Sequence, residues 1–328
     1  MSTPPRPSPQ LAEQLLVPAI ELGRTGVEPP ADVSLQVRQH ASEIRSLEPT
    51  RLRLQLEAAI CGHHPHLALQ WIRDAGLLIE ILPELDATVA FSQEGGRRHK
   101  DVWEHTKTVV LQAVPRPAVR WAALLHDIGK VPTRRFTSDG KVTFLGHAGE
   151  GARMFRRRVS RRFSFGPELK RCIEALILHH LRAGQYDGGW TDSAVRRFAR
   201  EMGPLLEDLL ALSRADITSK RPGKRAQCLQ QISALSVRVC ELEEADAKVK
   251  PLPPGLGNVL MRAFALPPGK HLAHLRQRLE HAHDAGSLEA GQEAEYYISF
   301  VREHELLVGL QIEPQRARHV VVADESGG

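Results

Sequence analysis

The sequence predicts a mainly α-helical protein, because apolar residues recur at intervals of three and four along most of the chain. An α-helix completes a turn in about 3.6 residues, so this spacing gathers apolar side chains on one face. No alternating run is long enough for a sheet, and Val320–Val322 is the single short candidate strand. With 328 residues, 42% of them hydrophobic, the chain is long enough for substantial helical cores.

The pattern changes along the chain in a way that predicts five segments. Residues 1–10 contain four prolines and are expected to form a disordered arm. Residues 11–87 form an N-terminal helical region, in which Leu52, Leu56 and Ile60 share a stripe. Residues 88–222 begin with a loop around Gly95-Gly96 and contain most of the residues suited to chemistry.

The remaining two segments are a helical tail and a frayed end. Residues 223–315 begin with a long helix, whose stripe of Ile232, Leu235 and Val239 is broken by the prolines of 251–254. Helices over 257–304 follow, and residues 316–328 are expected to be a frayed tail.

Composition excludes several classes of protein. The four cysteines are far apart and show no C-x-x-C spacing, so neither a disulfide framework nor a thiolate zinc site is predicted. No signal peptide and no run of about 20 apolar residues is present, so a cytoplasmic protein without a membrane partner is expected. The chain has 44 basic and 39 acidic residues, and a net charge of +5 is too small to establish a polyanionic partner.

Two ionisable residues lie on stripes that should be buried. His105 shares a face with Val102 and Val109, and Asp216 follows Leu209 and Leu212 at the same kind of spacing. A buried carboxylate without a partner is costly, so a bound cation is a reasonable partner.

Further metal-capable residues follow the same logic. His126 and Asp127 end an apolar run in which Gly129 is the expected helix stop, and His147 shares a face with Met154 and Phe155. The pair His179-His180 ends another apolar run, and we rank His179 as the ligand with His180 as a supporting or additional one. Taken singly, each is equally an ordinary core residue. Together, several imidazoles and two carboxylates suit divalent Mn, Fe, Co, Ni or Zn, with Mg less natural.

Other residues near these positions have more than one possible role. Lys130 is placed to contact a phosphate or to stand exposed at a helix end, and His99 and Arg98 either line the entrance or belong to a basic loop. Asp101 either orients His105, binds an extra metal or faces solvent.

Basic residues form three runs, which are either solvated surface or a site for the phosphate backbone of RNA. They are Arg153, Arg156, Arg157, Arg158, Arg161 and Arg162, then Arg196, Arg197 and Arg200, then Lys220, Arg221, Lys224 and Arg225. Arg197 is the member chosen as a candidate substrate-binding residue.

The order His, His-Asp, His, His-His, Asp resembles the signature of the HD superfamily of metal-dependent phosphohydrolases. A closer resemblance is to the HD-containing body and tail of bacterial CCA-adding tRNA nucleotidyltransferases. It is carried by His99-Lys-Asp-Val-Trp-Glu-His105-Thr, Leu125-His-Asp-Ile-Gly-Lys130, Gly146-His-Ala and Trp190-Thr-Asp-Ser-Ala-Val-Arg-Arg-Phe198. Ala75–Leu85 and, more loosely, Leu266–Gly269 with Glu293-Ala-Glu extend it to both flanks.

The nucleotidyltransferase head of that family is not expected in this chain. The head needs a Gly-Ser turn followed by an Asp-x-Asp pair, whereas Gly286-Ser287 lies late in the chain with no such pair after it. The resemblance implies an all-helical fold, phosphatase or 2′,3′-cyclic phosphodiesterase activity, and flanking helices that hold tRNA.

The resulting hypothesis is a phosphohydrolase acting on a nucleotide, a 2′,3′-cyclic phosphate or an RNA end. Two ions are expected, bridged by Asp127, one completed by His105, His126 and Asp216 and the other by His147 and His179. His126, Asp127 and Lys130 are the predicted catalytic residues. Two alternatives stay open: a non-catalytic tRNA-like RNA-binding protein, and one half of a split tRNA nucleotidyltransferase whose partner polypeptide carries the head.

Overall fold

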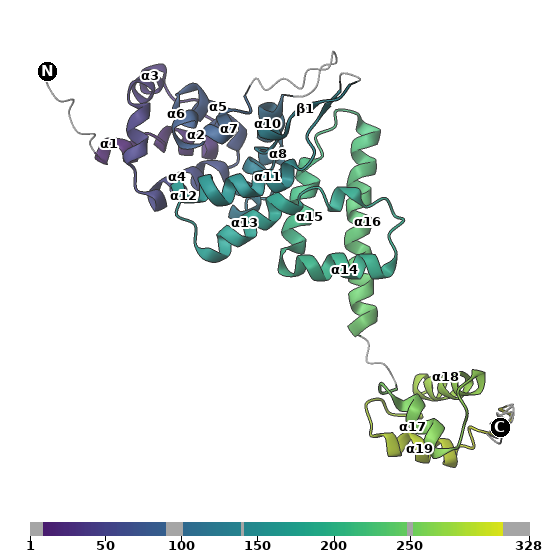
Figure 1. Ribbon diagram of the computed structural model, residues 1–328. Helices are drawn as coiled ribbons and strands as arrows, with labels where there is room; N and C mark the ends of the chain where they lie inside the picture. The colour runs from purple at the N-terminus through teal and green to yellow at the C-terminus, as the bar shows by residue number, and fades with distance from the viewer. Residues whose placement is uncertain (1–8, 90–100, 139–140, 248–251, 311–328) are drawn as a thin grey trace, which may run out of the picture. The chain divides into compact units, whose positions relative to one another are not determined.

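The computed structural model describes residues 9–89, 101–138, 141–247 and 252–310, and the fold is all-α, as predicted. By their contacts the residues divide into one unit up to Leu242 and a second unit from Glu243 onward. The first unit opens with eight short helices (Figure 1): α1 (Pro9–Gln14), α2 (Val17–Thr25), α3 (Ala31–Gln39), the 3₁₀ helix η1 (Ala41–Ser46), α4 (Pro49–Ile60), α5 (Pro65–Asp74), α6 (Leu77–Ile81) and α7 (Pro83–Asp86).

The rest of the first unit contains the segment in which the sequence concentrates its histidines. Its elements are α8 (Val102–Gln112), α9 (Pro117–Leu125), α10 (Lys130–Thr133), β1 (Arg135–Phe136), β2 (Val142–Thr143), α11 (His147–Met154), the π-helical turn η2 (Phe155–Val159), α12 (Ser160–Arg162), α13 (Pro167–His179), η3 (Ala183–Gln185), α14 (Asp192–Met202), η4 (Gly203–Leu205), α15 (Leu206–Asp216) and α16 (Pro222–Ala247). Most of α16 belongs to this unit, because Ile232, Leu235 and Val239 join its core.

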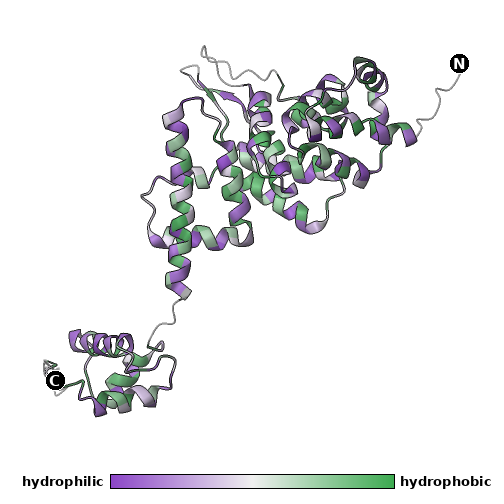
Figure 2. Cartoon of the chain, turned by 180° about the vertical axis from the view of Figure 1, so that it is seen from behind, coloured by the Kyte–Doolittle hydropathy of each residue, from purple (hydrophilic) through white to green (hydrophobic). Residues whose placement is uncertain are grey.

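The second unit is a small helical module with its own core. It contains α17 (Leu256–Ala263), α18 (Lys270–Asp284) and α19 (Ala294–Glu303). Leu275 and Leu279 of α18 pack with Tyr297 and Val301 of α19 in an apolar cluster. Within each unit the apolar faces of the helices turn inward and the polar faces outward (Figure 2).

Three details differ from the sequence prediction. Helix α1 starts at Pro9, within the segment expected to be disordered, and α16 joins the first unit although the tail was expected to begin at residue 223. Two strands are present that the pattern did not predict: β1 and β2 pair antiparallel, with Arg135 opposite Thr143. Strands of two residues are too short to produce an alternating pattern. The candidate strand Val320–Val322 lies outside the described residues.

Helix α9 lies at the centre of the first unit. It packs against α4, α8, α13 and α15, and every residue from Val119 to Leu125 is at most 5% exposed. Its one charged side chain, Arg120, donates to the carbonyl oxygens of Ile60 at 3.1 Å and Val114 at 3.2 Å, which partly offsets the cost of its burial. A helix that is apolar all round must be enclosed, so whatever follows α9 starts inside the protein.

Proline and glycine determine how the neighbouring helices approach α9. Pro117 begins α9 and Pro167 begins α13, where the missing N–H of proline costs no intrahelical hydrogen bond. Gly129 is not the left-handed helix stop that the sequence predicted, because its φ is −69°. Its role is close packing against the start of α11: a Cβ there would lie 2.1 Å from the carbonyl oxygen of His147.

We therefore expect Gly129→Ala to lower the free energy of unfolding by about 1–3 kcal/mol, because the added methyl group meets backbone atoms that cannot rotate away. Urea denaturation of the full chain measures this. The matched control is Gly149→Ala in α11, where a Cβ would meet nothing within 4 Å. That substitution should be neutral or stabilise by up to about 1 kcal/mol, because alanine favours helix. Equal effects of the two substitutions would contradict the packing role.

Candidate metal centre

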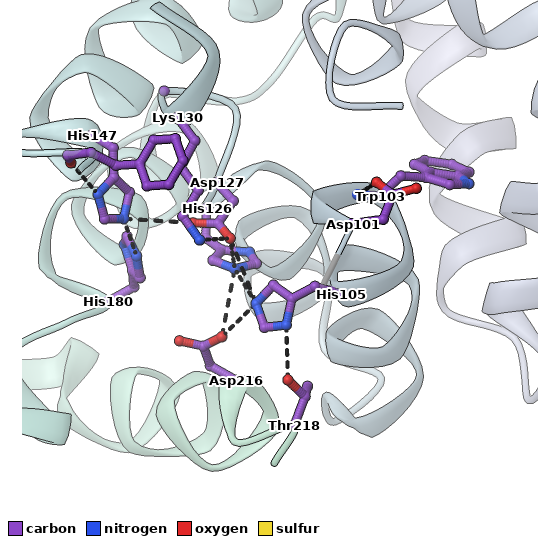
Figure 3. A network of polar contacts seen from close by, with 12 residues as sticks. Asp101, Trp103, His105, His126, Asp127, Lys130, His147, His180, Asp216 and Thr218 are labelled. Atoms are coloured by element: carbon purple, nitrogen blue, oxygen red, sulfur yellow. Dashed lines mark hydrogen bonds and ion pairs between the residues drawn. The ribbon is translucent and has the colours of Figure 1, made fainter. Parts of the chain in front are cut away.

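Six of the predicted side chains converge from the ends or inner faces of five helices (Figure 3). His105 comes from α8, His126 and Asp127 directly follow the buried helix α9, and His147 is the first residue of α11. The other two are His180, which follows α13, and Asp216, the last residue of α15. The separate buried stripes of the sequence thus meet in one place.

The first group of metal-capable atoms consists of His105, His126 and Asp216, whose ligand atoms all lie within 4.8 Å of one another. His105 Nε2 is 2.9 Å from Asp216 Oδ1 and 3.3 Å from His126 Nε2. His126 Nε2 is 3.6 Å from the same oxygen of Asp216. This is a compact set of two nitrogen atoms and one oxygen atom.

The second group consists of Asp127, His147 and His180, which satisfy the same distance limit. His147 Nε2 lies 3.3 Å from His180 Nε2 and 3.5 Å from Asp127 Oδ1. All three residues are largely buried, and His180 is 3% exposed.

Asp127 lies between the two groups. Its Oδ2 atom is 3.2 Å from His126 Nε2 and 3.6 Å from His105 Nε2, whereas its Oδ1 atom faces His147. One carboxylate therefore offers one oxygen to each group, which is the arrangement expected of a bridging ligand.

The four imidazoles are held in one orientation by hydrogen bonds to their Nδ1 atoms. The Nδ1 atoms of His126, His147 and His180 donate to the carbonyl oxygens of residues 123, 144 and 177 at 2.8, 2.9 and 2.7 Å. His105 Nδ1 bonds to the Thr218 hydroxyl at 2.9 Å. All four bonds orient the rings so that Nε2 is directed at the centre, and the three bonds to carbonyl oxygens also fix the tautomer.

The facing Nε2 atoms of His147 and His180 are the strongest indication of a cation. A carbonyl oxygen only accepts, so both Nδ1 atoms carry hydrogen and, in the neutral rings, both Nε2 atoms carry lone pairs. Burial lowers the pKa of His147, and burial together with the charge of His126 lowers the pKa of His180 to about 4. Two lone pairs 3.3 Å apart repel unless a cation binds them both. The donor set therefore fits a divalent metal.

The charges around Asp127 favour its ionised form. Burial opposes ionisation, but the positive charge of His126 and the neighbouring Lys130 hold the pKa of Asp127 well below its usual range. The pKa of Asp216 is lowered to about 2, because the hydrogen bond from His105 outweighs the effect of burial. Burial would lower the pKa of His126, yet attraction to Asp127 raises it to about 9.

Lys130 adds a positive charge at the edge of the centre. Its Nζ atom is 2.7 Å from Asp127 Oδ2 and lies over the ring of Phe144 at 5.8 Å. Its side chain is 19% exposed, so Lys130 is ion-paired to Asp127 and still open to solvent; contact with a phosphate stays a prediction.

The structure reverses the ranking of the two adjacent histidines. His179 is half-buried and belongs to neither group; burial and the nearby charge of Arg182 lower its pKa. Neighbouring helical residues point about 100° apart, so only one of them can face the centre. The signal that selects His180 was present in the sequence: Ile173, Ile177 and His180 are spaced by four and three, and all are buried.

Of the predicted substrate-binding residues other than Lys130, Arg197 is the one that the structure describes. Arg197 is exposed on α14, while His99 and Arg98 lie outside the described residues. Asp101 has a role that none of the three readings included: its Oδ1 atom accepts a hydrogen bond of 2.9 Å from the Trp103 amide and so caps α8. Thr218, which orients His105, was missed because it follows the end of α15, where no periodic pattern applies.

Comparison with known proteins agrees with this geometry. Residues 102–221 match the family model of the HD domain, so this part of the chain is an HD domain. Among the described residues, no helix has both the length and the apolar composition needed to cross a bilayer.

The chain is also similar to tRNA nucleotidyltransferases. It is 30% identical over 256 residues to the A-adding tRNA nucleotidyltransferase of Deinococcus radiodurans, a match that covers 76% of this chain and 57% of that protein. It is 35% identical over 186 residues to the CC-adding tRNA nucleotidyltransferase of Thermus thermophilus, covering 54% of this chain and 41% of the relative. A multifunctional CCA protein of Pseudomonas fluorescens is 31% identical over 150 residues, or 44% and 34% of the two chains. The matches thus span from about a third to somewhat more than half of these relatives.

The position of His180 leads to a direct test with an adjacent control. We expect His180→Ala to weaken divalent-metal binding by more than about 100-fold, because even residues that only support a metal ligand are worth 10–100-fold. His179→Ala should leave metal affinity within about threefold of the unmodified chain, since its ring points elsewhere. Isothermal titration calorimetry with Mn²⁺, after a chelator has removed bound metal from the protein, measures the affinity of both variants. Loss of metal in His179→Ala with retention in His180→Ala would restore the original ranking.

Proposed function

We propose that this chain is a metal-dependent phosphohydrolase, a phosphodiesterase or phosphatase, that acts on a nucleotide, a 2′,3′-cyclic phosphate or an RNA end. The observation that carries the proposal is the pair of neutral, buried Nε2 atoms of His147 and His180 facing each other at 3.3 Å. A merely structural bundle gains nothing from such a pair, because apolar side chains of similar volume would fill the space at lower cost.

The two groups of possible ligands favour the binding of two ions. Asp127 offers Oδ2 to His105 and His126 and Oδ1 to His147, so each group can hold one ion with a shared carboxylate. Imidazole-rich ligand sets suit Mn, Fe, Co or Ni better than Mg, although carboxylate oxygens leave Mg a candidate. When bound, such ions neutralise charge on phosphoryl oxygens and make water a better nucleophile at neutral pH.

The chain's own residues do the positioning. The carbonyl groups of residues 123, 144 and 177 and the Thr218 hydroxyl keep four imidazoles in place without rearrangement during the reaction. Lys130, already within 2.7 Å of the shared carboxylate, can exchange this contact for a phosphoryl oxygen of the substrate. Burial of His126 and Asp127 at 1% and 2% exposure excludes bulk water from the ligand side.

The substrate class is proposed from the relatives' names and from the charge of the centre. These relatives are named as enzymes that act on tRNA, and a phosphate ester of a nucleotide or of an RNA end matches a cationic centre with an adjacent lysine. Transfer of this substrate class to the present chain belongs to the proposal.

We expect Asp127→Asn to lower turnover of a 2′,3′-cyclic nucleotide by about 10³-fold or more, because a neutral amide cannot hold both ions and metal assistance is worth several kcal/mol. The assay compares phosphomonoesters, cyclic nucleotides and dinucleotides with Mn, Co, Ni and Mg after chelation. Asp187→Asn, an exposed loop substitution, is the matched control. Activity that survives both chelation and Asp127→Asn would rule the proposal out.

A second function, binding of tRNA-like RNA, is favoured by one surface. Arg157, Arg158 and Arg161 are exposed on η2 and α12, directly after α11, and within the described residues none of them forms an ion pair. Their neighbours differ: Arg153 pairs with Glu150 and Arg156 with Glu174. Three free guanidinium groups on one short segment suit a phosphate backbone.

We expect the triple substitution of Arg157, Arg158 and Arg161 by glutamine to weaken tRNA binding and to reduce the slope of log affinity against log salt by about two to three, since each phosphate contact contributes about 0.7–0.9. The matched control replaces three exposed arginines of the N-terminal helices, Arg24, Arg45 and Arg51, which changes net charge equally. Fluorescence anisotropy over a series of salt concentrations measures the slope. Identical slopes for the two triple variants would contradict a role for this surface. If metal-dependent hydrolysis is absent while the slope changes as expected, the non-catalytic function is the correct one.

A further inference from the structure

A cavity of about 350 Å³ adjoins the metal centre on the side of α15 and α16. It shares two residues with the centre, His180 and Asp216, and its other walls come from η3, the end of α15 and the first half of α16. Small-molecule sites are about 300–1,000 Å³, so this cavity suits one small group and not a length of oligonucleotide.

The lining of this cavity is uncharged apart from the residues of the centre. No lysine or arginine is among its lining residues in the described chain; the polar ones include Gln185, Tyr186 and Gln231. Ile217 and Ile232 add apolar surface. A second phosphate group placed here would find no lysine or arginine to pair with, whereas a neutral group with hydrogen-bonding edges needs no such partner.

The polar side chains of the lining are available to a ligand. Among the described residues, the side-chain amides of Gln185 and Gln231 and the hydroxyl of Tyr186 make no hydrogen bond to the protein, although Tyr186 is only 8% exposed. The Tyr186 ring is itself held edge-on to Trp190, with ring centroids 5.5 Å apart. A fixed aromatic ring and two free amides are groups that recognise a base or a ribose.

We infer that this cavity binds the nucleoside part of the substrate, with Gln231 and Tyr186 contacting it, while the phosphate lies at the metal centre. The inference rests on the proposed function for the position of the phosphate. It makes the preferred substrate a nucleoside monophosphate, its cyclic form or the terminal nucleoside of an RNA, and it disfavours nucleoside di- and triphosphates whose extra phosphates would extend into the cavity.

The test uses Gln231→Leu, with Gln230→Leu as its control, because Gln230 is exposed on the same helix and does not line the cavity. In the chelated, metal-free chain, adenosine binding is measured by calorimetry. Gln231→Leu should raise the Kd for adenosine about tenfold, the effect of one lost hydrogen bond in a buried site, and Gln230→Leu should not change it. Cys228→Phe, which fills the cavity, should abolish binding, whereas Cys240→Phe on the exposed part of the helix should not.

A second measurement uses the chain loaded with Mn²⁺. The ratio of kcat/KM for adenosine 2′,3′-cyclic phosphate to that for glycerol 1,2-cyclic phosphate, which has the same reacting ring without ribose or base, should fall about tenfold in Gln231→Leu. Adenosine binding that depends on Gln231 in a chain without hydrolytic activity would support the nucleoside cavity and overturn the proposed function. Hydrolysis of both cyclic phosphates with no adenosine binding, or equal effects of the Gln231 and Gln230 substitutions, would overturn the cavity assignment alone.

Discussion

The close approach of four imidazoles and two carboxylates inside the protein is the constraint on which the rest of the first unit depends. Asp127 is 2% exposed and His126 is 1% exposed, so neither can exchange its contacts for water. Positive charge must therefore be supplied from within. Without a metal, His126 supplies part of this positive charge, because its raised pKa of about 9 keeps the ring protonated at neutral pH. A divalent ion would replace that proton. The lone pairs of His147 and His180 have no such proton, because both pKa values are lowered.

The helical fold meets this constraint by bringing ligands in at helix ends and by tying them to backbone carbonyls. Helix α9 is enclosed on all sides, so the two residues that follow it emerge at the centre of the unit. The absence of a side chain at Gly129 lets α11 begin against this turn, which brings His147 close to Asp127. Because three of the four rings are bonded to carbonyl groups three residues before them in the chain, their orientation follows from the local backbone and does not depend on distant contacts.

The sequence was sufficient to predict the structural features that follow from helical periodicity. The all-α class is confirmed, and the inward-facing positions of His105 and Asp216 were predicted from buried stripes, since an ionisable residue at regular spacing shows directly in the pattern. The structure places His180, and not His179, in a metal-capable group, and the buried stripe of Ile173, Ile177 and His180 already favoured His180 in the sequence. The roles of Asp101 and Thr218 could not be predicted, since each depends on the geometry of a helix end. The steric role of Gly129 depends on a contact between separate segments, which no local pattern encodes.

The distribution of charge around the centre gives a bound substrate a direction. Lys130 and Asp216 lie on opposite sides of the His126-Asp127 pair (Figure 3). The lysine side offers a cation that is 19% exposed, and the Asp216 side adjoins a cavity whose lining contains no lysine or arginine in the described chain. An ester with a charged phosphate at one end and a neutral nucleoside at the other matches this polarity in only one orientation. A substrate turned around would place its nucleoside beside the charged Lys130 and direct its phosphate group away from that lysine, so each end would lose its favourable partner. Selection of orientation thus needs no base-specific contact at the centre itself, because the charge difference between the two sides is sufficient.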